Sequence, residues 1–171
     1  MKNKISTTFI VKSAVIAALY AIMTVVISPL SYGTVQCRFS EALVMLCAFT
    51  PASIPGLTVG CLVANIFSFN PIDMICGTTA TLLSAVAGYK LRNIKIGGIP
   101  WLTPLPAVIF NMVIIGLELS IYLPIEGRGF LVGFLIQALS VFAGQVMACY
   151  IFGVPVYIII NKTGLKKIIN E

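Results

Sequence analysis

The chain has 171 residues, of which 59% are apolar and only 9% are charged. Its mean hydropathy is +1.06, which excludes a water-soluble domain because a water-facing surface needs many more ionisable side chains. At roughly 20 residues per transmembrane helix, about six spans would use most of the sequence. We therefore expect one integral-membrane domain over residues 1–171, an all-α bundle of about six transmembrane helices.

The absence of histidine excludes haem, imidazole-ligated zinc and every catalytic triad or proton relay that depends on histidine. The five cysteines show no CxxC spacing, and no G-x-x-x-x-G-K-[S/T] motif for ATP hydrolysis occurs. We therefore expect no enzymatic activity, no cofactor and no metal site.

Proline, glycine and charged residues divide the chain into six apolar segments. In chain order, the predicted spans are Thr8–Ser28, Ser40–Thr50, Ser53–Ser68, Ile72–Tyr89, Thr103–Tyr122 and Phe130–Ile160. The second is too short to cross a hydrocarbon core of ~30 Å unless it begins in the preceding loop.

Basic residues gather at both ends of the chain and between the fourth and fifth spans. They are Lys2, Lys4 and Lys12, then Lys90, Arg92 and Lys95, and finally Lys162, Lys166 and Lys167. With an even number of spans, all of them fall on one side of the membrane, as the positive-inside rule requires. This pattern predicts that both termini are cytoplasmic.

Strongly polar side chains then fall in the outer half of the bundle. Glu41 opens the second span, Asn65 lies near the outer end of the third, Asp73 begins the fourth, and Glu118 lies about one turn from the outer end of the fifth. Asn111 and Glu118 are seven residues apart and so share one helical face. A carboxylate within a span costs ~2.5–3.5 kcal/mol, so Glu118 predicts a partner cation or a wet cavity.

Simpler interpretations remain open for the other polar residues. Glu41 can pair with Arg38 at i,i+3, and Asp73 can act as a helix N-terminal charge. Asn65, Asn111 and Gln137 can make ordinary hydrogen bonds between helices.

Two overlapping pairs of small residues mark the first span. Ala14 with Ala18, and Ala17 with Ala21, remove side-chain bulk and allow a second helix to approach closely. They indicate either packing within the chain or docking to another membrane subunit.

Several sequence blocks resemble the QueT family, and together they cover nearly the whole chain. They are the run Tyr32–Leu43, Gly56-Leu57-x-x-Gly60-Cys61-x-x-Ala64-Asn65, Asp73, Gly77-x-x-Ala80-Thr81-Leu82, Pro104-Leu105-Pro106, Asn111 and Gly116-Leu117-Glu118. One departure is Gln145, where a glutamate is expected in relatives.

The resemblance implies a plasma-membrane substrate-capture subunit of an energy-coupling-factor (ECF) transporter, which imports a queuosine precursor such as 7-aminomethyl-7-deazaguanine. It implies as partners a transmembrane coupling protein, facing Ala14/Ala18 or Ala17/Ala21, and two ABC ATPases. The surrounding lipid bilayer is a further expected partner, and no nucleic acid is expected to bind.

Such a ligand can be matched to the outer-half residues. One carboxylate can accept the ring N–H and exocyclic amine of a deazaguanine, and a second can hold the cationic aminomethyl arm. The acceptors are Glu118 and Glu41, in either assignment. The candidate donors are Asn65, Asn111, Gln36 and Arg38, and Tyr32 is a candidate stacking surface. A stand-alone carrier that uses Glu118 for proton coupling is the alternative.

Overall fold

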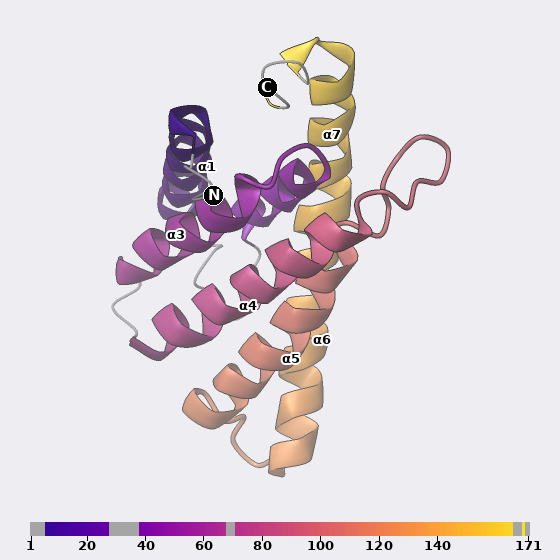
Figure 1. The fold of residues 1–171 in the computed structure, drawn as a ribbon. Coiled ribbons are helices and arrows are strands. Elements are labelled where there is room, and N and C mark those ends of the chain that lie inside the picture. The colour runs from indigo at the N-terminus through magenta and orange to yellow at the C-terminus, as the bar shows by residue number, and fades with distance from the viewer. Residues whose placement is uncertain (1–5, 28–37, 68–70, 166–168, 170–171) are drawn as a thin grey trace.

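The computed structural model describes residues 6–27, 38–67, 71–165 and 169, and these form a bundle of helices without a strand (Figure 1). The elements are α1 (Thr7–Val26), the 3₁₀ helix η1 (Phe39–Ala48), α3 (Ser53–Ile66), α4 (Pro71–Leu91), α5 (Leu105–Tyr122), α6 (Phe130–Val146), the π-helix η2 (Met147–Phe152) and α7 (Gly153–Lys162). Four helical stretches are long and apolar enough to cross a membrane. The predicted all-α membrane fold is therefore confirmed.

The second predicted span is the short helix η1, which lies inside the bundle. Its ten residues rise only about 20 Å as a 3₁₀ helix, less than the hydrocarbon thickness. Every side chain from Ser40 to Cys47 is buried, and η1 contacts α1, α3, α4 and α7. An element this short is tolerated at membrane depth because the neighbouring helices surround most of it.

The last predicted span is one apolar rod of 33 residues, Phe130–Lys162, which the π-helix η2 divides into α6 and α7. Pro155 follows η2 and explains this division, because proline lacks an N–H and clashes with the carbonyl four residues earlier. Gly153 then lets the rod approach η1 closely. A Cβ there would lie 3.2 Å from the carbonyl oxygen of Ala42.

Two glycines bring α3 against α1. A Cβ on Gly56 would lie 2.8 Å from the Cβ of Ile16, and one on Gly60 would lie 2.7 Å from the Cβ of Tyr20. The backbone of Ala17 is equally close to Gly60. The side of α1 that carries Ala17 therefore packs within the chain.

The basic regions lie near one another. The Lys12 amine at the start of α1 donates to the carbonyl oxygen of Ile169, at 3.0 Å. The Tyr157 hydroxyl of α7 donates to the carbonyl oxygen of Gly98 in the basic α4–α5 loop, at 3.2 Å. In Figure 1, the α5–α6 connection lies at the opposite end of the long rod from α7. The fold thus has a basic end and an end with few basic residues among those described.

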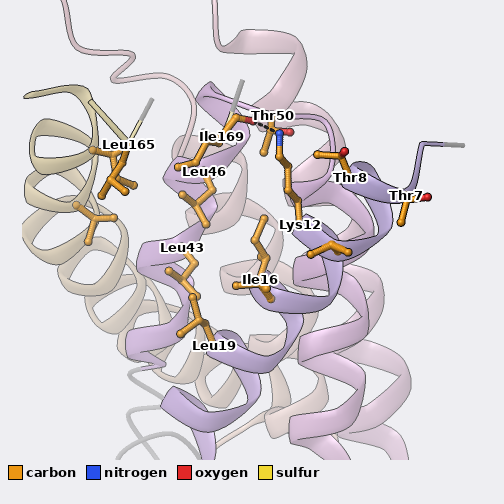
Figure 2. Close-up of a pocket in the computed structure, with 14 residues that line it drawn as sticks. Thr7, Thr8, Lys12, Ile16, Leu19, Leu43, Leu46, Thr50, Leu165 and Ile169 are labelled. Atoms are coloured by element: carbon orange, nitrogen blue, oxygen red, sulfur yellow. Dashed lines mark hydrogen bonds between the residues drawn. The ribbon is translucent and has the colours of Figure 1, made fainter. Parts of the chain in front are cut away.

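A long groove, which we call the α1–α7 groove, runs between α1 and α7 with η1 as its floor (Figure 2). Its volume is about 900 Å³. A second cavity, of about 190 Å³, lies between α5 and α6 and is lined in part by Gln137 and Ser140.

Candidate functional site

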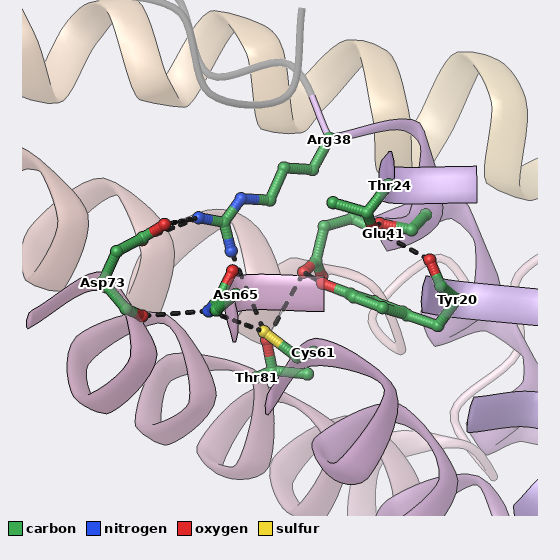
Figure 3. A network of polar contacts seen from close by, with 9 residues as sticks. Tyr20, Thr24, Arg38, Glu41, Cys61, Asn65, Asp73 and Thr81 are labelled. Atoms are coloured by element: carbon green, nitrogen blue, oxygen red, sulfur yellow. Dashed lines mark hydrogen bonds and ion pairs between the residues drawn. The ribbon is translucent and has the colours of Figure 1, made fainter. Parts of the chain in front are cut away.

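A buried ion pair joins Arg38, just before η1, to Asp73 in the first turn of α4 (Figure 3). The Nη2 atom of Arg38 donates to both carboxylate oxygens of Asp73, at 2.7 and 2.9 Å. The two residues are 2% and 3% exposed. The alternative of an Arg38–Glu41 pair is therefore wrong, because the arginine reaches across to α4. Asp73 does lie in a first helical turn, but it also balances a buried charge.

Glu41 is completely buried and binds α1 instead. Its Oε1 accepts a hydrogen bond from the Tyr20 hydroxyl at 2.5 Å and a longer one from Thr81 at 3.4 Å. Among the residues that the structure describes, Oε2 has no hydrogen-bond partner. A second bond, from Thr24 to the Ser40 hydroxyl at 2.7 Å, also ties α1 to η1. The carboxylate is thus held through one oxygen while the other keeps its acceptor capacity.

Asn65 completes this group from the end of α3. Its amide nitrogen donates to the Asp73 carbonyl oxygen at 2.9 Å and contacts the Cys61 sulfur at 3.5 Å. Gly77 leaves the room that this arrangement needs, because a Cβ there would lie 2.7 Å from that nitrogen and 3.0 Å from Nη1 of Arg38. We call Tyr20, Arg38, Glu41, Asn65, Asp73 and Thr81 the polar cluster.

Glu118 and Asn111 lie on α5, which packs against α4. They are 5% and 1% exposed, so both are on the interior side of the helix, as their spacing predicts. Glu118 interacts electrostatically with Asp73 and Arg38 of the polar cluster. Asn111 donates to the carbonyl oxygen of Ala107 in its own helix, at 2.9 Å. Contact between these residues and a ligand stays a prediction.

The sequence predicts part of this cluster. It places Glu41, Asn65 and Arg38 in the outer half of the bundle, whereas Gln36 and Tyr32 lie outside the described residues. It does not indicate Tyr20 or Thr81, because single hydroxyls in apolar helices carry little sequence signal. The Arg38–Asp73 pair had a detectable signal, since a carboxylate at membrane depth calls for a cation and Arg38 is predicted on the same side.

The two pairs of alanines separate in the structure. Ala17 and Ala21 are half-buried, on the side of α1 that meets the bundle, whereas Ala14 and Ala18 are exposed. A role for Ala14 and Ala18 in binding another subunit therefore stays open, while Ala17 packs beside Gly60 within the chain.

The chain matches one family over most of its length. The family model described as QueT transporter covers residues 10–162. A Lactococcus lactis subsp. cremoris (strain MG1363) protein named queuosine precursor transporter QueT is 38% identical over 91 residues. That alignment covers 52% of this chain and 54% of the relative, so the chain spans about half the length of the curated relative it matches. No solved structure matches.

Proposed function

Because the chain belongs to the QueT transporter family, we propose that it captures a queuosine precursor, 7-aminomethyl-7-deazaguanine or a related deazaguanine, for uptake into the cell. The family consists of membrane transporters and not of enzymes. The observation that carries the proposal is the match over residues 10–162, which includes the whole polar cluster. The name of the Lactococcus relative supports the substrate class.

The charges of the buried residues agree with a cationic heterocycle. Asp73 already balances Arg38, so Glu41 and Glu118 remain as the two further acids of this region. One carboxylate binds the ring N–H and amine of the base, and the other binds the aminomethyl cation. The acceptor capacity of Glu41 Oε2 supports this role. Arg38 and Asn65 both donate hydrogen bonds to Asp73 and so fix one side of the proposed site. Asn111 supplies a donor from α5.

Transport against a gradient requires an energy source, and the sequence has no P-loop motif. We therefore propose that the chain is the capture subunit of an ECF transporter, with a coupling protein and two ABC ATPases as partners. The exposed Ala14 and Ala18 are the proposed contact with the coupling protein. Both termini are proposed to be cytoplasmic, because the basic residues would then lie inside.

Uptake of labelled 7-aminomethyl-7-deazaguanine by cells that express the chain tests this mechanism. We expect uptake to require both the chain and the ATPase subunits. It should persist with a protonophore as long as cellular ATP is maintained. Uptake that continues without the ATPases and collapses with the protonophore would instead establish the proton-coupled carrier.

A further inference from the structure

The α1–α7 groove is separate from the polar cluster and is formed by one continuous face of α1. Its lining residues on α1 recur at helical spacing, so that seven side chains face the groove. They are Thr7, Thr8, Val11, Lys12, Val15, Ile16 and Leu19. Leu43 and Leu46 of η1 form the floor, and the opposite wall is formed by α7 together with Leu165 and Ile169, which follow it. None of the residues that line this groove belongs to the polar cluster.

The groove is polar at one end and apolar along the rest of its length. Lys12 and the threonines Thr7, Thr8 and Thr50 all lie where α1 begins and η1 has ended, and the ten other lining side chains are apolar. Figure 2 shows the Lys12 side chain extending toward Thr50 and Ile169, with Leu19 and Leu43 at the far end. A ligand that fits this groove has a polar or charged head and a long apolar tail.

The length of the groove corresponds to one leaflet of a bilayer. From Thr7 to Leu19, α1 rises about 18 Å at ~1.5 Å per residue. One leaflet contributes about 15 Å, half of the ~30 Å hydrocarbon core. The volume of about 900 Å³ is near the upper end of the ~300–1,000 Å³ of small-molecule sites, which is ample for an acyl chain.

The charge of the polar end indicates an anionic head group. The Lys12 ammonium has three N–H donors, and one of them binds the carbonyl oxygen of Ile169. Its other donors and the hydroxyls of Thr7 and Thr8 suit phosphate oxygens. Lys12 lies in an apolar helix, where a charged side chain is costly unless an opposite charge is near it. A lipid phosphate held by Lys12 would supply that opposite charge.

We propose that the α1–α7 groove binds an acyl chain of an anionic phospholipid, whose phosphate is held by Lys12. This lipid site lies in the leaflet at the basic end of the bundle. It is independent of the transported substrate, and it makes a lipid of defined charge part of the α1–η1–α7 interface.

Native mass spectrometry of the chain released from nanodiscs, made from equal amounts of phosphatidylglycerol and phosphatidylcholine, tests this proposal. The wild-type chain should retain one phosphatidylglycerol in preference to phosphatidylcholine. Lys12→Gln should lower that preference about tenfold. Lys95→Gln, which removes an exposed lysine from the α4–α5 loop, should leave it unchanged.

A second pair of variants separates the groove from the general lipid surface. Val15→Trp places a large side chain in the groove and should abolish lipid retention. Val113→Trp makes the same change on α5, where the valine is similarly exposed, 44% against 53%, and should retain the lipid. Equal retention of both lipids by the wild-type chain would overturn the proposal. So would equal effects of Lys12→Gln and Lys95→Gln, or of Val15→Trp and Val113→Trp. Each of these results would mean that a protein partner or bulk lipid fills the groove instead.

Discussion

At the scale of single residues, the Arg38–Asp73 pair anchors the polar cluster. Arg38→Met leaves the Asp73 carboxylate buried without its counter-charge, and we expect a loss of about 3–5 kcal/mol in stability. The double variant Arg38→Met/Asp73→Leu removes both charges and should recover most of this loss. Thermal unfolding in detergent measures both effects. A single variant as stable as the wild type would show that the pair does not hold the fold.

The residues of the site could be predicted only in part. Glu118 and Glu41 can be identified from the sequence because placing a carboxylate in an apolar segment costs free energy, which a binding partner must offset. Their partners were not, because Tyr20 is 21 residues from Glu41 and Asp73 is 35 residues from Arg38. Helical periodicity relates residues a few positions apart, whereas these contacts depend on how separate helices pack.

At the scale of elements, Gly60 sets the distance between α1 and α3. Gly60→Ala forces a Cβ to within 2.7 Å of the Tyr20 Cβ and 2.8 Å of a backbone oxygen, and we expect a loss of about 1–3 kcal/mol. Gly133→Ala is the matched control, because its Cβ would meet nothing within 4 Å. That variant should be neutral or slightly stabilising, since alanine is the better helix former. Equal unfolding midpoints for both variants would contradict this account of the interface.

The exposed alanines of α1 can be tested against the inward ones. Ala18→Leu should leave the stability of the isolated chain nearly unchanged, because Ala18 is exposed. It should nevertheless reduce co-purification with the coupling protein and its ATPases. Ala17→Leu should lower stability instead, because the Ala17 backbone lies against Gly60. If Ala18→Leu co-purifies as well as the wild type, this face is not the contact.

The elements themselves were largely predictable. Apolar length alone placed the long spans within a few residues of α1, α4 and α5. It did not reveal that the second span is a 3₁₀ helix or that the sixth contains a π-helix. Both features depend on close packing between η1 and the rod near Gly153, which hydropathy does not record.

At the scale of the whole molecule, the fold places the polar cluster and the α1–α7 groove apart from each other, and no residue that lines the groove belongs to the cluster. Four members of the polar cluster lie at or beside the ends of η1, α3 and α4 that are remote from the basic α4–α5 loop, namely Arg38, Glu41, Asn65 and Asp73. The groove opens where Lys12 lies, at the basic end. In the proposed transporter, one end captures the ligand while α1 presents its exposed alanines to the energy-coupling partner.

Isothermal titration of the purified chain with 7-aminomethyl-7-deazaguanine tests the central claim most directly. We expect the wild-type chain to bind this base in preference to guanine and to unrelated vitamins. Glu118→Gln should fold normally yet lose ~2–5 kcal/mol of binding free energy, because the ligand loses a buried charged partner. Glu126→Gln, in the exposed α5–α6 loop, should bind like the wild type. A flat titration of the wild type, or unchanged affinity in Glu118→Gln, would contradict the account.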